Sequence, residues 1–134
     1  MAGPAEERQA RETFRRYERV RRRRDFERLR AGRTIRGTVL TLQYLPSPTG
    51  VSRLGVQVGK RVGPAVVRNK VKRRLREQFR RMKHRIEKPT DLLLWAYPES
   101  AKASSALIRQ DLECVLTEAR LLRPVSDAHN QSVP

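Results

Sequence analysis

Residues 60–88 include thirteen basic side chains. Two carboxylates, Glu77 and Glu87, lie among them. Such crowding of like charge destabilises a helix unless a polyanion neutralises it. Arginine guanidinium groups bind phosphates through planar forks of hydrogen-bond donors. The segment therefore predicts a surface that binds the phosphates of a nucleic acid.

The same segment has the period of one long amphipathic helix that begins near Pro64, a residue that suits the first helical turn. An apolar stripe is expected to pack on a sheet and consists of Val67, Val71, Leu75, Phe79, Met82 and Ile86. The opposite stripe consists of Asn69, Arg73, Arg76 and Arg80. Cations also gather at the helix N-terminus, where free N–H groups and the helix dipole favour phosphate. The candidate nucleic-acid-binding residues are therefore Lys60, Arg61, Arg68, Asn69, Lys70, Lys72, Arg73, Arg76 and Arg80.

Side chains that could hydrolyse a bond do not form a catalytic or metal-binding pattern. His84 lies among basic residues and His129 lies near the C-terminus, so a histidine pair is not expected. A two-metal carboxylate cluster is not expected either, because the acidic residues of this region fall in different elements. Residues 59–63 lack the spacing of a phosphate-binding P-loop. Cys114 lies near an apolar helix stripe and is interpreted as a buried structural thiol.

Two further helices are predicted, one before and one after the basic helix in the chain. The first contains Phe26 and Leu29, is capped by Asp25, and ends at Gly32. The last ends before Pro124 and carries the apolar stripe Ile108, Leu112, Val115, Ala119 and Leu122. Each helix has one apolar face, so each must pack against another element.

Three strands are predicted to supply that partner surface. Residues 35–45 and 54–58 have strand patterns and are expected to form a hairpin across the turn cluster 46–50. Residues 92–97 form a continuous apolar run, typical of a strand covered on both faces. The element order is therefore α-β-β-α-β-α. The predicted fold class is α+β, an α/β sandwich with a small sheet.

The composition fits one small, strongly basic domain. The chain has 134 residues, of which 37% are hydrophobic and 34% charged, with a net charge of +17. Residues 14–123 are predicted to form a single RNA-binding domain between disordered tails at 1–13 and 124–134. One cysteine allows neither a disulfide framework nor a cysteine zinc site within one chain. Without a secretion signal or a membrane-spanning stretch, a cytoplasmic protein with no membrane partner is expected.

Residues 59–77 resemble the signature segment of the bacterial ribonuclease P protein subunit, and here they read Gly-Lys-Arg-Val-Gly-Pro-Ala-Val-Val-Arg-Asn-Lys-Val-Lys-Arg-Arg-Leu-Arg-Glu. That pattern fixes Gly, Ala, Asn and Glu as well as basic positions. The resemblance extends over residues 21–121 through Asp25-Phe26, the strand that begins with Arg53, and Asp91 before the apolar run. The chain departs from the family at Gly59, where Ser is usual, and at Arg30, where a second aromatic residue is usual.

The resemblance implies a fold, partners and an activity. The fold would contain a left-handed β-α-β crossover, against the general right-handed rule. The partners would be the catalytic RNA of ribonuclease P and precursor tRNA, with no obligate protein partner. The RNA would remove the 5′ leader with Mg²⁺ bound mainly by the RNA, so the protein would have no catalytic residue of its own. The protein would contact that RNA through the Arg-Asn helix and hold the leader between the first helix and the sheet, with Phe26, Arg30 and Arg36 as candidates.

Two other functions stay open at this point. A ribosomal or other structural RNA-binding protein with no role in tRNA processing would share the charge but not the fixed Arg-Asn segment. A sequence-specific DNA-binding protein would need a helix-turn-helix or a dimerisation heptad, and neither pattern is found.

Overall fold

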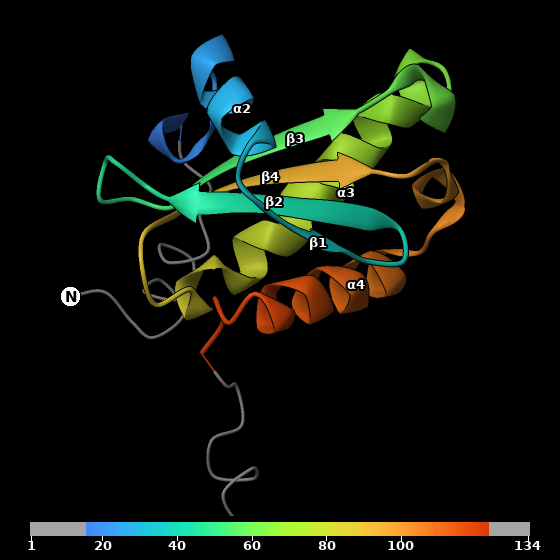
Figure 1. Ribbon diagram of the computed structural model, residues 1–134. Coiled ribbons are helices and arrows are strands. Elements are labelled where there is room, and N and C mark those ends of the chain that lie inside the picture. The colour runs from blue at the N-terminus through green and yellow to red at the C-terminus, as the bar shows by residue number, and fades with distance from the viewer. Residues whose placement is uncertain (1–15, 124–134) are drawn as a thin grey trace, which may run out of the picture.

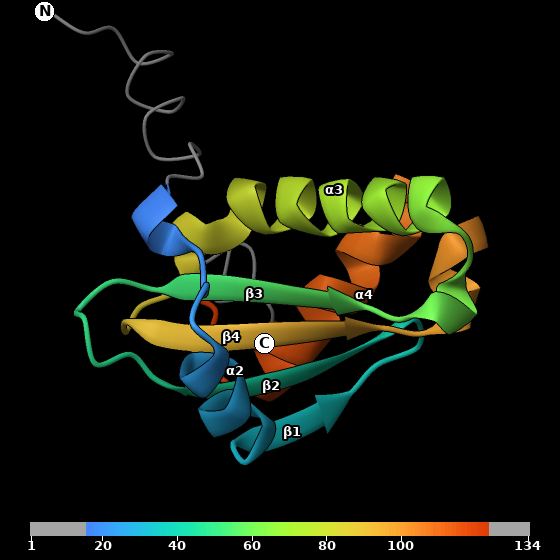
Figure 2. The same ribbon diagram turned by 90° about the horizontal axis from the view of Figure 1, so that it is seen from above.

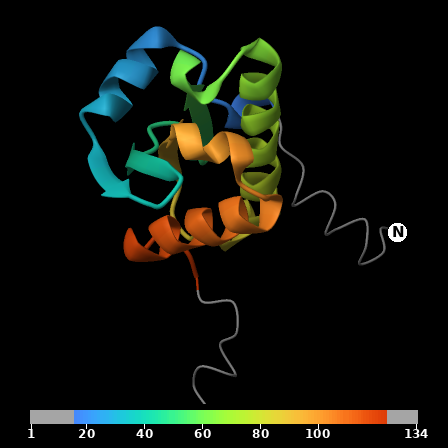
Figure 3. The same ribbon diagram turned by 90° about the vertical axis from the view of Figure 1, so that its right-hand side faces the viewer.

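A four-stranded mixed sheet lies at the centre of the fold in a computed structural model that describes residues 16–123 (Figure 1). The strands lie in the order β1-β2-β4-β3 and are β1 (Arg33–Arg36), β2 (Leu40–Pro46), β3 (Arg53–Val58) and β4 (Thr90–Ala96). Helices α3 (Ala65–Met82) and α4 (Ser105–Glu118) cover one face, and α2 (Arg23–Arg30) lies on the other (Figure 3). The predicted α+β sandwich is confirmed. The predicted tails, 1–13 and 124–134, lie outside the described residues.

Strand β4 is the central strand, and this corrects the predicted hairpin of residues 35–45 with 54–58. Strand β2 pairs antiparallel with one side of β4, and β3 pairs parallel with its other side. The first five residues of β4 are all buried, on both faces of the sheet. A central position in the sheet provides this cover for both faces. Residues 35–45 contain a turn, and β1 and β2 form the antiparallel pair on either side of it.

The connection from β3 through α3 to β4 is the left-handed crossover that the resemblance implied. Strands β3 and β4 are parallel neighbours. Both point the same way in Figure 1, with β4 below β3 and α3 behind the sheet. In the view from above, α3 lies along the upper side of the picture, with β3 and then β4 below it, so the helix is on one side of both strands (Figure 2). This connection is therefore an exception to the right-handed rule.

The two faces of α3 are arranged as the sequence predicts. Its apolar stripe packs into the main core, where Val71, Leu75 and Phe79 are each 1% exposed. Met82 and Ile86 are also buried, although α3 ends at Met82 and a 3-10 turn (Lys83–Arg85) leads to Ile86. Each fully buried side chain of this size contributes about 1.5 to 3 kcal/mol to folding. This burial holds a highly charged helix in place.

Helix α2 is held on the sheet by an ion-pair cluster, and this corrects the predicted capping role of Asp25. The N-cap residue of α2 makes no side-chain cap bond, and Asp25 lies in the first turn. Its carboxylate instead lies 3.5 Å from the Arg53 guanidinium on β3. Arg53 also donates to the fully buried Asp91 at 2.9 Å, and Arg28 of α2 pairs with the same carboxylate. Asp91 therefore ties α2 to two strands.

Helix α4 buries a carboxylate and exposes its cysteine. Asp111 accepts hydrogen bonds from the backbone N–H groups of Thr38, Val39 and Leu40 at 2.8 to 3.1 Å, which fixes the turn between β1 and β2. Cys114 is exposed, so its interpretation as a buried thiol was wrong. It follows the buried Leu112 by two residues, about 200° around the helix, and so faces away from the core.

Candidate nucleic-acid interface

The outer side of α3 carries the predicted basic residues. Exposed residues of the predicted set are Lys60, Arg61, Asn69, Lys70 and Arg73. Half-buried ones are Arg68, Lys72, Arg76 and Arg80. Lys60 and Arg61 precede α3 in a 3-10 turn (Lys60–Val62), whereas the others lie on the helix itself. The predicted set therefore extends from the turn before α3 to its last helical turn.

The turn before α3 fixes one of these side chains. Gly63 has φ 149°, a region that side-chain-bearing residues rarely adopt, and a Cβ at this position would lie 3.1 Å from Val67 Cβ. Arg68 Nε donates to the Gly63 carbonyl oxygen at 3.1 Å. Arg68 is therefore held beside the first turn of α3, where the backbone N–H groups and the helix dipole favour an anion.

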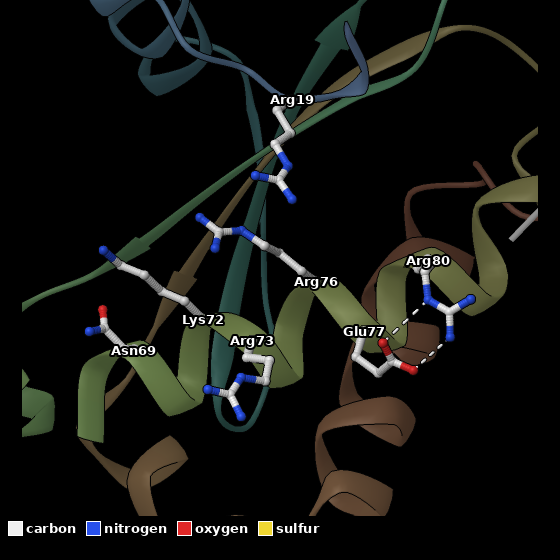
Figure 4. Close-up of a pocket in the computed structure, with 7 residues that line it drawn as sticks. All are labelled: Arg19, Asn69, Lys72, Arg73, Arg76, Glu77 and Arg80. Carbon is white, nitrogen blue, oxygen red and sulfur yellow. Dashed lines mark hydrogen bonds and ion pairs between the residues drawn. The ribbon is translucent and has the colours of Figure 1, made fainter. Parts of the chain in front are cut away.

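A groove of about 420 Å³ runs along α3 and brings five of the predicted residues together. Its lining consists of Arg19, Asn69, Lys72, Arg73, Arg76, Glu77 and Arg80 (Figure 4). Lys60, Arg61, Arg68 and Lys70 are not among the lining residues. The groove thus has one wall from α3, and its other wall includes Arg19 from the segment before α2.

Arg19 was missed by the sequence analysis. With Glu18 beside it, Arg19 lies in a sequence typical of a mixed-charge surface segment. The local sequence therefore does not indicate that Arg19 belongs to a binding site. Arg19 forms an isolated parallel bridge with Leu54, on the edge of β3. This long-range pairing helps to bring Arg19 alongside a helix more than forty positions later in the chain.

The basic side chains of the groove repel one another, and its carboxylate is engaged by neighbouring arginines. Burial lowers the pKa of the Arg76 guanidinium, and the nearby charge of Arg19 lowers it further. The Glu77 carboxylate accepts a 2.7 Å hydrogen bond from Arg80 and lies 3.3 Å from Arg81. Its hydrogen bond with Arg80 is the main cause that lowers the pKa of Glu77, so this carboxylate stays ionised and engaged. The groove can therefore attract an anion.

A second hollow, of about 720 Å³, lies on the face of the sheet opposite α3 and α4. It is lined by Arg30, Thr34, Arg36, Thr41, Gln43, Trp95, Ala96 and Tyr97, and we call it the sheet cleft. The Arg30 guanidinium lies over the Trp95 ring, 5.5 Å from its centre. Trp95 Nε1 donates to Gln43 at 2.6 Å, and Gln43 donates to the Arg30 carbonyl oxygen at 3.0 Å. The cleft therefore presents a fixed aromatic and cationic surface.

Two of the three leader candidates, Arg30 and Arg36, meet in the sheet cleft, and Phe26 does not line it. Phe26 packs against Val20 and Leu93, and a Cβ added at Gly55 would lie 2.7 Å from its ring. Trp95 was missed, because its place in an apolar run predicted complete burial. It is half-buried in the structure, which corrects the expected covering of both faces at this end of β4.

Catalytic and metal-binding side chains do not gather elsewhere in residues 16–123. This part of the chain holds no group of three or more His, Cys, Asp or Glu residues that could bind a metal ion. His84 is exposed, and His129 lies outside the described residues. None of the helices within 16–123 combines the length and apolar character needed to span a bilayer.

Comparisons with known proteins agree with this geometry. A family model described as Ribonuclease P matches residues 14–120. The ribonuclease P protein component of Thermus aquaticus is 45% identical over 100 residues, which cover 75% of this chain and 59% of that protein. That of Thermus oshimai is 47% identical over 98 residues, covering 73% and 62%. The chain thus spans about three fifths of the length of these relatives.

Solved structures give the same result. The Staphylococcus aureus RNase P protein has a TM-score of 0.72 and 29% identity, with 79% of this chain and 98% of that chain covered. The Thermotoga maritima RNase P protein has a TM-score of 0.68 and 30% identity, with 75% and 96% covered. From the match of the family model to residues 14–120 and from these relatives, we conclude that the chain belongs to the Ribonuclease P family.

Proposed function

We propose that this chain is the protein subunit of ribonuclease P, which binds the catalytic RNA and the 5′ leader of precursor tRNA. The observation that carries the proposal is the cationic groove on α3, formed in a chain of this family. Relatives from Thermus are named ribonuclease P protein components, and their partners extend to this chain only as part of the proposal.

The outer side of α3 binds the catalytic RNA in this proposal. Arginine forks such as Arg73 and Arg76 contact phosphates, and the Asn69 amide both donates and accepts hydrogen bonds at base edges or 2′-hydroxyls. Val66, which is 79% exposed and lies one turn before Asn69, adds an apolar contact on the same helix. This combination of charged, amide and apolar groups favours the binding of structured RNA over nonspecific electrostatic binding of anions.

The sheet cleft holds the leader. Single-stranded RNA presents unstacked bases, which stack on aromatic rings and on guanidinium planes. Trp95 provides an aromatic ring and Arg30 a guanidinium plane for stacking. Arg36, which also lines the cleft, can bind a leader phosphate. Arg30 thus replaces the second aromatic residue of the family pattern with a cation that stacks on Trp95.

The chemistry of cleavage belongs to the RNA subunit, with Mg²⁺ bound mainly there. Carboxylates are the protein ligands that Mg²⁺ prefers. Asp91 is engaged by Arg28 and Arg53, and Asp111 is engaged by three backbone N–H groups. These buried carboxylates do not fit a Mg²⁺ site. The protein's own contribution is to bind and orient RNA.

The direct test is processing of a precursor tRNA after the chain is mixed with a bacterial ribonuclease P RNA. At low Mg²⁺ we expect cleavage at the mature 5′ end to require the RNA and to be stimulated by the protein. The protein alone should yield no specific product. Specific cleavage by RNA-free protein, or no stimulation of the RNA, would contradict the proposal and favour a structural RNA-binding role.

A double variant, Arg68→Ala with Asn69→Ala, tests the role of α3. Both side chains lie outside the apolar stripe, so the loss of stability should stay within the value of one hydrogen bond, about 1 kcal/mol. Affinity for the catalytic RNA should fall at least about tenfold, since charge-assisted bonds are lost. Binding titrations and chemical denaturation measure the two effects.

Leu75→Ala is the matched control for that variant. Its side chain is buried, so the substitution should cost about 2 to 5 kcal/mol of stability while the remaining folded protein binds RNA normally. If the double variant instead binds like wild type and loses its stability, the assignment of the two faces of α3 is wrong.

Substitution of Trp95 tests the sheet cleft. Stacking contributes about 1 to 3 kcal/mol per base, so Trp95→Ala should weaken binding of precursor tRNA by that amount in the RNA–protein complex. Mature tRNA, which lacks the leader, should bind as before. Trp95→Phe keeps an aromatic ring and should retain most of the affinity. Equal losses for precursor and mature tRNA would show that the cleft does not hold the leader.

A further inference from the structure

Arg19 lies across the groove from the basic side chains of α3. Figure 4 shows its guanidinium directed toward that of Arg76, with Lys72 beside them. Two cations that face each other across a hollow repel each other. The fold nevertheless brings them together from two elements that are distant in sequence.

The segment that carries Arg19 is fixed on both sides. Val20 is buried, and its N–H donates to the Leu54 carbonyl oxygen at 2.9 Å. Glu18 forms an ion pair with Lys83, just after α3, and both side chains are only 11% exposed. The backbone of Arg19 is therefore held beside α3 at its two neighbouring residues.

The charge balance shows that this site suits an anion. Burial and the charge of Arg19 both lower the pKa of Arg76, so the protonated guanidinium is less stable here than in water. Glu77, the carboxylate among the lining residues, is engaged by Arg80 and Arg81 at the far end of the stripe. An anion between Arg19 and Arg76 would relieve the repulsion.

We propose that the groove binds the sugar-phosphate backbone of an RNA strand, with one phosphate held between Arg19 and Arg76. This inference rests on the proposed function and adds Arg19, on the opposite wall of the groove, to the surface on α3. A phosphodiester has two non-bridging oxygens, so each can accept from one guanidinium and convert a repulsion into two charge-assisted hydrogen bonds. Lys72 meets the adjacent phosphate as a point charge. A linear backbone fits this recessed groove, whereas a flat membrane surface does not.

The first experiment measures how salt affects binding of wild type and Arg19→Gln to ribonuclease P RNA. Loss of one phosphate contact should lower affinity roughly tenfold and reduce the slope of log affinity against log salt by about 1. Arg109→Gln is the control, because it removes the same charge from an exposed position on α4 outside both hollows. The control should change affinity and slope much less. Melting temperatures of both variants should match wild type.

A double-mutant cycle tests whether Arg19 and Arg76 share one phosphate. The double variant Arg19→Gln with Arg76→Gln should lose much less affinity than the sum of the two single losses, because either single change already breaks the shared site. Arg19→Gln combined with Lys60→Gln, which lies in the turn before α3, should be additive. Additive losses for Arg19 and Arg76 would overturn the shared phosphate.

Two arms identify the RNA that supplies the phosphate. A loss seen with the catalytic RNA alone assigns the phosphate to that RNA, and a loss seen only when leader-bearing precursor tRNA is added assigns it to the leader. Either result supports the groove as a phosphate site. Wild-type affinity and slope for Arg19→Gln in both arms would overturn this inference alone. Failure of the wild-type chain to bind or stimulate the RNA would contradict the proposed function itself.

Discussion

Mutual repulsion of the positive charges along α3 is the constraint on which the rest of the structure depends. An isolated helix of this composition is unstable, because like charges one turn apart oppose each other. The buried side chains of Val71, Leu75 and Phe79 offset this cost by attaching the helix to the sheet. Repulsion between the cations on the outer side of α3 remains. A bound polyanion neutralises these cations, and the loss of their repulsion adds to the favourable free energy of binding.

Buried carboxylates position the two candidate surfaces. Glu18 holds the second wall of the groove through Lys83, and Asp91 holds α2 through Arg28 and Arg53. Helix α2 in turn carries Arg30 over Trp95 at the sheet cleft. These acidic side chains act inside the fold, whereas cations form most of the groove lining and Arg30 and Arg36 supply positive charge to the sheet cleft. A strongly basic chain thereby keeps a defined shape and a positive binding surface.

Local periodicity predicted the elements, and it failed where distant segments meet. The two faces of α3 followed from the spacing of residues such as Leu75, because one helix repeats every 3.6 residues. The hairpin was wrong because strand patterns show which face is buried but not which strand is the neighbour. Arg19 was missed because long-range contacts, among them its pairing with Leu54, bring it to the groove. Trp95 was missed because an apolar run in the sequence does not show which of its residues are buried on both faces and which are only half-buried.

The salt dependence of binding to the catalytic RNA tests the central claim most directly, namely that RNA phosphates balance the charge on α3. Binding is titrated between about 50 and 200 mM monovalent salt, with a constant Mg²⁺ concentration. Neutralisation of five or more phosphates predicts a linear fall of log affinity with log salt, with a slope of about −4 or steeper. A flat response over this range would contradict the account, because the cations of the groove would then play no part in binding.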